Sequence, residues 1–434
     1  MPVEHTVQDI GITELADRFG TPLYVYDGNG LRDRITTVRE RLHPRLEVFF
    51  SLKSNPNIAV CALLHAHGAR AEVSSMTELA TARRAGVAPH DIIFLGPGKS
   101  RTELAACLDE GVAVIICESF GELELIDRLA RERSVTARVA LRVNPEFAVK
   151  GSGLTMGGKP RQFGIDEAQL RDPSARELLC GLTNVAVMGV QVYMGTRILS
   201  EDAVAENTRR ILDLAEGLSA ELDFPLDLVD VGGGLGVAYF ENEKDLDFDR
   251  LAELVNPPLD AFARRHPATR MVMELGRYLT APFGTYTTRV RYVKTSMGEN
   301  FAVADGGTNH HMAAVGIGSF VKRNFPMKVL NRLDEPATGD WNITGPLCTP
   351  NDTLGKKVPL PDVRPGDLIG VECSGAYGPS ASPVLFLSHG HPAEVLVLDG
   401  EAHLVRDRDR PDDLLRNQRL PGPALLNRTG SAAG

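Results

Sequence analysis

Short apolar runs alternate with longer amphipathic stretches over the first two-thirds of the chain. In the segment 201–218, Val204, Ile211, Leu212 and Leu218 recur at spacings that place them on one face of a helix. The apolar runs are continuous rather than alternating, which is typical of strands buried on both faces in a parallel sheet. We therefore expect strands over 46–51, 69–73, 92–95, 113–117, 137–143, 185–192, 226–231 and 271–274.

Eight strand–helix units in about 230 residues favour a (β/α)8 TIM barrel. Periodicity does not show whether a sheet closes, so an open, doubly wound sheet remains the alternative. Beyond residue 285 the pattern changes, and 394–405 reads as two strands joined at Asp399-Gly400, a pair typical of tight hairpins. The sequence thus predicts an α/β barrel over 28–285, an antiparallel β-barrel or sandwich over 286–405 with residues 1–27 packed on it, and a tail over 406–434.

Composition and charge exclude several classes of protein. The 434 residues are 43% hydrophobic and 24% charged, which excludes a mainly disordered chain. The formal net charge of −10 disfavours a nucleic-acid binder, and no apolar run approaches the roughly 20 residues of a membrane span. The N-terminus lacks the layout of a signal peptide, so we expect a cytoplasmic protein. The six cysteines form no CxxC pair and do not predict a disulfide framework or a zinc site.

Polar residues gather just beyond the C-terminal ends of the expected barrel strands, where barrel active sites form. Lys53 follows the first strand; it is either an exposed side chain or, if desolvated, a nucleophilic amine that can hold pyridoxal phosphate. Gly232–Gly234 follow the seventh strand, where a glycine triplet is either a simple turn or a phosphate site. Glu274 and Arg277 follow the last strand, as a surface pair or as partners of a pyridine nitrogen and a phosphate.

Two loops and a histidine pair in the expected second domain give weaker indications of function. The segments 345–352 (GPLCTPND) and 374–380 (SGAYGPS) have ordinary turn composition. Cys348 nevertheless lies outside any apolar run, unlike most of the other cysteines, which favours a reactive thiol. His310 and His311 are adjacent on an expected strand and would point to opposite faces, so we expect no metal site.

A series of ordered motifs resembles the fold-type III pyridoxal-phosphate decarboxylases, the ornithine/diaminopimelate decarboxylase family. The resemblance runs from about residue 20 to about residue 400. It implies an alanine-racemase-like barrel followed by a β domain. The motifs are FFSLKSN, AEVSSMTELATARRAG, GPGKS, LRVNP, QFGI, VYMGT, VGGGLG, MELGRYL, DGG, GPLCTPND and SGAY.

The resemblance also implies roles for individual residues. Lys53 matches the Schiff-base lysine, Glu274 the partner of the pyridine nitrogen, and Cys348 the thiol that returns a proton to the substrate. That cysteine acts from the neighbouring subunit, so the resemblance implies a homodimer with shared active sites. Tyr193 replaces the family's stacked histidine; it can stack on the ring but carries no imidazolium charge. The other implied cofactor contacts are Gly232, Gly233, Gly234, Gly276, Arg277 and Tyr377.

Departures from the family pattern bear on the substrate. Thr349 follows Cys348 where relatives carry a carboxylate that binds a distal amino group, which argues against a distal ammonium group. Lys322 and Arg323 stand where the family's usual Arg-Pro-x-Leu-Tyr is missing, and they suit a distal carboxylate or a carrier phosphate, unless they are a solvated pair. Arg142 matches a family arginine at the barrel rim. The chain resembles in particular decarboxylases of antibiotic biosynthesis that act on glutamate tethered to an acyl-carrier protein.

We therefore expect pyridoxal-phosphate-dependent decarboxylation, at Cα, of a carrier-bound or otherwise modified amino acid in a secondary-metabolite pathway. A diaminopimelate decarboxylase, an amino-acid racemase and an inactive regulatory homologue remain alternatives. Thr349 argues against the first. Glu274 argues against the second, because a protonated ring nitrogen favours full carbanion formation. The presence of Lys53 and Cys348 argues against the third. We expect no nucleic-acid or membrane partner.

Overall fold

The computed structural model describes residues 3–147, 154–155, 157–315 and 323–421. Eight parallel strands pair in a closed ring, because each pairs with its neighbour in the chain and the last pairs with the first. The predicted barrel is therefore confirmed, and the open sheet is wrong. The strands are β4 (Leu46–Ser51), β5 (Arg70–Val73), β6 (Ile92–Phe94), β7 (Val114–Cys117), β8 (Ala137–Asn144), β11 (Val185–Gln191), β13 (Leu228–Gly233) and β14 (Arg270–Leu275).

Helices surround this ring, and three successive helices begin with the same local signal. Ser75, Ser100 and Ser119 each cap a helix by accepting a hydrogen bond from the backbone N–H of a glutamate three residues later. These caps fix the loops that leave the barrel's C-terminal end. The helical segments are α2 (Gly28–Arg41), η1 (Leu52–Ser54), α3 (Ile58–Ala66), α4 (Met76–Arg84), α5 (Arg101–Glu110), α6 (Phe120–Arg133), α7 (Glu167–Leu170), α8 (Pro173–Gly181), α9 (Glu201–Leu222), α10 (Phe248–Arg265) and α11 (Arg277–Thr280).

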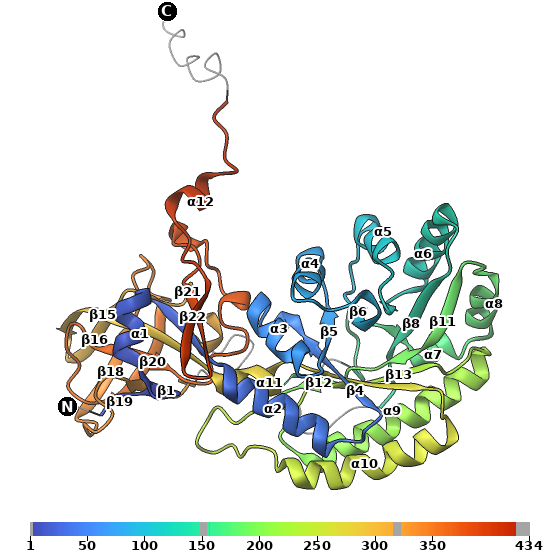
Figure 1. Ribbon diagram of the computed structural model, residues 1–434, viewed down its shortest axis with the longest axis horizontal. Helices are drawn as coiled ribbons and strands as arrows, with labels where there is room; N and C mark the ends of the chain where they lie inside the picture. The colour runs from blue at the N-terminus through green and yellow to red at the C-terminus, as the bar shows by residue number, and fades with distance from the viewer. Residues whose placement is uncertain (1–2, 148–153, 156, 316–322, 422–434) are drawn as a thin grey trace, which may run out of the picture.

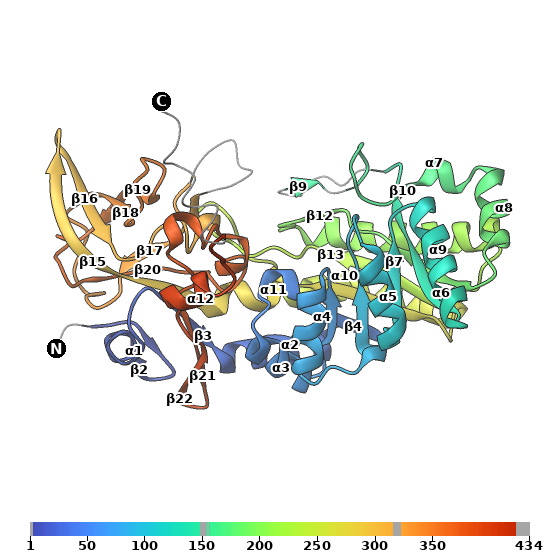
Figure 2. The same cartoon turned by 90° about the horizontal axis from the view of Figure 1, so that it is seen from above.

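The second sheet lies at the other end of the molecule from the barrel (Figures 1 and 2). It is mainly antiparallel, but β16 pairs in parallel with β18 and β3 with β21. Asp399 and Gly400 both have positive φ, +50° and +78°, which confirms the predicted hairpin. The strands are β3 (Leu23–Asp27), β15 (Gly284–Ser296), β16 (Glu299–Ala304), β17 (Met327–Val329), β18 (Gly339–Thr344), β19 (Thr353–Leu360), β20 (Leu368–Val371), β21 (Ala393–Leu398) and β22 (Glu401–Arg406).

The N-terminal segment contributes to the second sheet before the chain enters the barrel. β3 pairs with both β15 and β21, and α1 (Ile12–Phe19) buries Ile12 and Leu15 in the same cluster as residues of β21. On this pairing we propose the barrel at 28–285 and the β domain at 286–405 plus residues 1–27 as the two domains. Short pairs elsewhere are β1 (Thr6–Val7) with β2 (Ile10–Gly11), β9 (Leu154–Thr155) with β12 (Gly195–Thr196), and β10 (Ile165–Asp166) with β8.

His310 and His311 lie in a turn after β16 rather than on a strand, so the strand expected there is wrong. Both rings are buried and have protein partners: His310 Nε2 lies 3.0 Å from the Gly390 carbonyl oxygen, and His311 Nε2 lies 2.7 Å from Ser374 Oγ. Burial lowers the pKa of His310 to about 4 and that of His311 to about 3, so both rings stay neutral. In the described ranges, metal-ligating side chains do not gather in groups of three or more.

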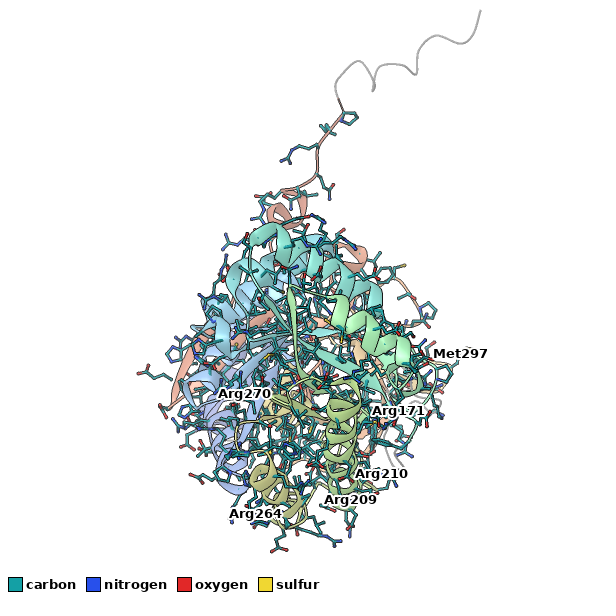
Figure 3. The ribbon with its side chains drawn as sticks, turned by 90° about the vertical axis from the view of Figure 1, so that its right-hand side faces the viewer. Arg171, Arg209, Arg210, Arg264, Arg270 and Met297 are labelled. Carbon is teal, nitrogen blue, oxygen red and sulfur yellow. The ribbon has the colours of Figure 1, made fainter. Side chains whose placement is uncertain are left out.

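The helices in the described part of the chain are too short or too polar to cross a membrane. On the outer surface of the barrel they carry many arginines, including Arg171, Arg209, Arg210 and Arg264 (Figure 3). Each of these arginines forms an ion pair with a carboxylate three or four residues away. Such pairs are typical of a solvated helix surface and contribute little to stability.

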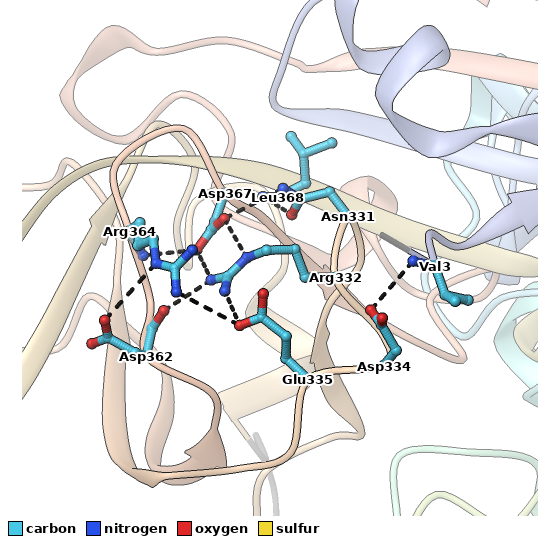
Figure 4. A network of polar contacts seen from close by, with 9 residues as sticks. All are labelled: Val3, Asn331, Arg332, Asp334, Glu335, Asp362, Arg364, Asp367 and Leu368. Atoms are coloured by element: carbon cyan, nitrogen blue, oxygen red, sulfur yellow. Dashed lines mark hydrogen bonds and ion pairs between the residues drawn. The ribbon is translucent and has the colours of Figure 1, made fainter. Parts of the chain in front are cut away.

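A buried ion pair anchors one edge of the second sheet (Figure 4). Arg332 donates two hydrogen bonds to Asp367, at 3.1 Å and 2.5 Å, and both side chains are less than 10% exposed. Glu335 also pairs with Arg332, and the backbone N–H of Arg364 donates to Asp367 at 2.7 Å. The network therefore joins the loop after β17 to the loop before β20.

Replacing Asp367 by alanine should lower the free energy of unfolding by roughly 3 kcal/mol, because it leaves the buried Arg332 guanidinium without its main partner. Urea denaturation measures the change. Asp362→Ala is the matched control, since the Asp362 carboxylate is 73% exposed and lies 3.9 Å from Arg364. We expect it to cost less than about 1 kcal/mol. Equal losses in the two variants would contradict this assignment.

Candidate active site

A layer of polar side chains lies directly above an apolar layer inside the barrel. Side chains two residues apart on a strand point to the same face, so Asp230 follows Leu228, and Glu274 follows Val272, on the inner face. Gln191 stands in register with Asp230 on the neighbouring strand. These three polar side chains are at most 2% exposed. The apolar layer therefore excludes water below, and the charged groups face the barrel's C-terminal end.

Lys53 enters this polar layer from the turn after β4. Its Nζ lies 3.1 Å from Glu72 Oε2 and 5.6 Å from the centre of the Tyr193 ring. Burial opposes the ammonium charge, but Glu72, Glu274, Tyr377 and Tyr193 together outweigh it and raise the pKa of Lys53. In the chain by itself the amine is therefore protonated at neutral pH, and it becomes a nucleophile only after losing that proton.

Glu72 is a site residue that the sequence analysis missed. It lies in β5, is fully buried, and accepts a hydrogen bond from Ser74 Oγ at 3.0 Å. Burial works toward a raised pKa, but Lys53 and the hydroxyls of Ser51 and Ser74 outweigh it, so the pKa of Glu72 is lowered. The available signal was a carboxylate in the middle of an apolar strand, which requires a partner when buried.

The Glu274 carboxylate has one oxygen paired and one left over. Gln191 Nε2 donates to Glu274 Oε1 at 3.0 Å, whereas Oε2 is buried without a hydrogen-bond partner among the described residues. Burial and the neighbouring Glu274 raise the pKa of Asp230 well above its usual range. Asp230 therefore holds a proton at neutral pH. Burial and Glu72 also raise the pKa of Glu274, while Lys53 works against that rise.

The glycines at the end of β13 form a turn that only glycine permits. Gly232 and Gly234 have φ values of +66° and +80°. A Cβ on Gly233 would lie 1.7 Å from the Glu274 carbonyl oxygen, and one on Gly234 would lie 1.9 Å from the Gly195 carbonyl oxygen. The turn therefore packs tightly between its neighbours, beside the polar layer. This close approach accounts for all three glycines whether or not they bind a phosphate.

Arg277 stands at the start of α11, next to this glycine turn. Its Nη1 donates to Tyr239 Oη at 2.8 Å, and its guanidinium lies 4.6 Å from the centre of the Tyr377 ring. Its Nε is buried without a hydrogen-bond partner in the described part of the chain. Gly276, just before it, packs against Ser54, since a Cβ there would come within 2.9 Å. The arginine is thus held by two aromatic side chains, and its buried Nε stays without a partner among the described residues.

The turn that carries Lys53 is bonded to a loop of the second sheet. The backbone N–H of Tyr377 donates to the Ser54 carbonyl at 2.7 Å, and Asn55 Nδ2 donates to the Gly375 carbonyl at 3.0 Å. Tyr377 has a left-handed φ of +56°, which turns its ring toward Arg277. The predicted residues Lys53, Tyr193, Glu274, Arg277 and Tyr377 are therefore brought together with the glycine turn.

Other predicted residues lie elsewhere. Cys348 is exposed in the loop between β18 and β19, with Thr349 beside it, and among the described residues neither has a hydrogen bond or ion pair to the polar layer. Arg323 donates to Asn242 Oδ1 at 2.9 Å. Lys322 lies outside the described residues.

Arg142 lies within the barrel's polar layer but is already paired. Its Nη1 donates to Glu118 Oε1 at 2.8 Å, and its guanidinium lies 4.6 Å from the centre of the Phe163 ring. Glu118 also accepts from the backbone N–H of Gly164 at 2.9 Å. The arginine therefore holds the 162–164 loop in place, and its charge is balanced before any substrate binds.

The residues present fit pyridoxal phosphate. The unpartnered Glu274 Oε2 suits a protonated pyridine nitrogen, and the unused Nε of Arg277 suits a phosphate oxygen. Lys53 has an amine of the kind that can react with an aldehyde, and Tyr193 lies next to that amine. The donor set thus contains a partner for each end of the cofactor.

Glu72→Gln should let the amine of Lys53 react at lower pH. The substitution removes the carboxylate that raises the pKa of Lys53 most. Because burial still opposes the ammonium charge, we expect the pKa of Lys53 to fall below that in the wild type. The measurement is the rate at which the cofactor-free protein takes up pyridoxal phosphate covalently, followed by absorbance as a function of pH. Glu78→Gln, a change at a carboxyl bonded to the backbone of Ser74, is the control. An unchanged pH profile in Glu72→Gln would contradict the role of this pair.

Known proteins are similar in sequence to this chain along nearly its whole length. The family described as "Pyridoxal-dependent decarboxylase, pyridoxal binding domain" matches residues 29–281. L-glutamyl-[BtrI acyl-carrier protein] decarboxylase from Niallia circulans is 39% identical, over 94% of this chain and 96% of that protein. Diaminopimelate decarboxylase from Archaeoglobus fulgidus is 30% identical, over 96% of this chain and 97% of that protein.

Solved structures agree with this relationship. Diaminopimelate decarboxylase from Helicobacter pylori, complexed with L-lysine, has a TM-score of 0.82 and 28% identity, over 93% of this chain and 98% of that chain. The family match spans more than half of the chain, including all eight barrel strands, Lys53, Glu72 and Glu274. This chain therefore belongs to the pyridoxal-dependent decarboxylases of fold-type III, and pyridoxal phosphate is its cofactor.

Proposed function

We propose that this decarboxylase removes the α-carboxyl group of an amino acid that is joined through its side chain to an acyl-carrier protein. The relative from Niallia circulans, 39% identical over 94% of this chain, is named for such a carrier-linked substrate. Decarboxylation at Cα requires a free α-amino and a free α-carboxyl group. The amino acid can therefore be attached to the carrier protein only through its side chain.

The main support for this proposal is Thr349, the residue that follows the exposed Cys348. A substrate with a distal ammonium group needs a carboxylate partner once it is removed from water. Thr349 offers only a hydroxyl and a backbone N–H, and the latter donates to the Leu347 carbonyl at 2.8 Å. A neutral thioester needs no such charge, so threonine suits a side chain that is bound as an acyl group.

Pyridoxal phosphate, when bound, supplies the ring that accepts the electrons of the breaking carbon–carbon bond. Lys53 would hold the cofactor through its amine, and Glu72 stabilises the positive charge on Lys53. Glu274 would keep a proton at the ring nitrogen. Arg277 and the glycine turn would bind the phosphate.

We also propose that two chains share each active site. Cys348 and Thr349 are exposed on the second sheet, and among the described residues they have no hydrogen bond or ion pair to the polar layer around Lys53. A homodimer in which this loop enters the partner's barrel would bring the thiol to the substrate, where it donates a proton to Cα. The cytoplasmic location and the role in antibiotic biosynthesis remain predictions.

A diaminopimelate decarboxylase is the second candidate. Relatives with that name are 28% to 30% identical over more than nine-tenths of this chain. Diaminopimelate carries a second amino and a second carboxyl group, so it needs a partner for a distal ammonium, which Thr349 does not provide. The two candidates differ in one measurable quantity, the release of CO2 from each substrate.

We expect CO2 release from glutamate loaded as a thioester on a carrier protein, and at least about a hundredfold lower kcat/KM with diaminopimelate, because an unpaired buried charge costs several kcal/mol. Radiolabelled or infrared CO2 assays with both substrates measure the difference. Lys53→Ala should abolish release from either. Faster turnover of diaminopimelate by the wild-type enzyme would contradict the carrier-linked assignment.

Mixing two inactive variants tests the shared site. Lys53→Ala and Cys348→Ala should each be inactive or nearly so as homodimers. Half of a random mixture is heterodimer, and one of its two sites then has both groups intact, so about a quarter of wild-type activity should return. Each variant mixed with itself under the same refolding or co-expression protocol is the control. A mixture that stays at the level of the single variants would show that lysine and cysteine act from the same chain.

A further inference from the structure

A groove of about 600 Å³ lies on the second sheet beside the Cys348 loop. Pro350 and Asn351, which follow Thr349, form part of its wall, and Arg323, Lys356 and Lys357 line it as well. The groove therefore adjoins the loop that we place at the partner's active site. A molecule bound in the groove would lie next to the substrate but outside the barrel.

A β-bulge in β19 places two consecutive lysines on the same groove. In a regular strand, Lys356 and Lys357 would point to opposite faces of the sheet. Here the register with β18 shifts between Trp341 and Ile343, so that the two lysines stand opposite one residue, Asn342. Lys357 has a left-handed φ of +51°, which is uncommon for a residue with a side chain. The strain is local, and its result is a pair of ammonium groups that face the same space.

Asparagines hold this arrangement in place. Asn324 pairs with the backbone of Lys356 in both directions, donating at 2.7 Å and accepting at 2.9 Å. Asn342 Oδ1 accepts from the backbone N–H of Lys357 at 3.2 Å. The backbone under both lysines is therefore fixed by side chains from two other segments, while the ammonium group of Lys356 forms no ion pair among the described residues.

The groove carries a net positive charge in a protein that is acidic overall. Three cationic side chains line it against one carboxylate, Glu299, which lies 3.7 Å from Lys357 and is 44% exposed. The chain has ten lysines, five of them between residues 294 and 357. The arginines on the barrel helices form close ion pairs with neighbouring acids, whereas Lys356 has no ion pair within the described residues.

We propose that this groove binds the phosphodiester of the phosphopantetheine arm through which a carrier protein presents the amino acid. This inference rests on the proposed function, because it assumes an acyl group held on such an arm. Phosphate oxygens accept strong hydrogen bonds from ammonium and guanidinium groups. The thioester end of the arm then reaches past Pro350 and Asn351 to the active site, while the carrier protein stays outside.

The position of the groove favours a phosphodiester as its ligand over the carboxylate of the substrate. A carboxylate to be removed must lie at the cofactor, and the groove lies outside the barrel beside the Cys348 loop. The groove also has the amide side chain of Asn351, which is of the kind that can bond to the peptide groups of a pantetheine chain. A charged site with a neighbouring amide thus matches both parts of the arm.

Binding to the holoenzyme tests the groove directly, because the phosphate site in the barrel is then filled by the cofactor. Pantetheine 4′-phosphate should bind roughly tenfold to a hundredfold more tightly than pantetheine in isothermal titration calorimetry, since a hydrogen bond to a charged group contributes that much. The double variant Lys356→Ala, Lys357→Ala should lose this preference. Lys328→Ala is the matched control, because Lys328 lies outside the groove and pairs with Glu372 at 2.8 Å.

Four results would overturn the proposal. Three are no detectable binding of pantetheine 4′-phosphate, equal binding of pantetheine, and a preference that survives in the double variant. The fourth is binding of inorganic phosphate as tight as that of pantetheine 4′-phosphate, which would indicate a simple anion site. These measurements need no turnover. Failure of the proposed function would show separately, as absence of CO2 release from a loaded carrier.

Kinetics give a second readout. With a loaded carrier, the double variant should raise KM by about tenfold or more with little change in kcat, because the phosphate contact is the same before and during the reaction. Lys356→Arg, Lys357→Arg keeps both charges and should restore KM. A fall in kcat alone, with KM unchanged, would contradict a role in binding the arm.

Discussion

The active site depends on a half-buried cation that lies among buried carboxyl groups. Lys53 lies 3.1 Å from Glu72, and Glu274 and a protonated Asp230 complete the set. Removing such charges from water is costly unless each has a partner, and here the partners come from different strands of a closed ring. Closure of the barrel is therefore the condition for the chemistry, because an open sheet would not bring β5 and β14 to opposite sides of one lysine.

Much of the fold could be predicted because the barrel strands are apolar on both faces. The eight expected segments coincide with the eight barrel strands to within two residues at each end, and the turn at Asp399-Gly400 forms the expected hairpin. Ring closure could not be derived from periodicity, since it depends on pairing between β14 and β4. The strand expected at His310 and His311 is a turn, because both rings find partners in distant loops.

The site was predictable where a residue type or spacing is distinctive, and less so where two distant segments meet. Lys53 and Arg277 follow strands, Glu274 lies near the end of β14, and all three match family motifs. Glu72 was missed because an acid inside a strand gives no hint of the lysine it meets. The paired lysines on β19 could not be foreseen either, since strand alternation places adjacent residues on opposite faces and only the bulge reverses this.

The hydrogen bonds from Tyr377 to Ser54 and from Asn55 to Gly375 have a consequence for how substrates reach the cofactor. They tie the backbone around the reactive lysine to the other half of the same polypeptide. A clamshell motion of the two halves would have to break both bonds, which opposes such a motion. They favour entry and exit of substrates while both halves keep their mutual orientation.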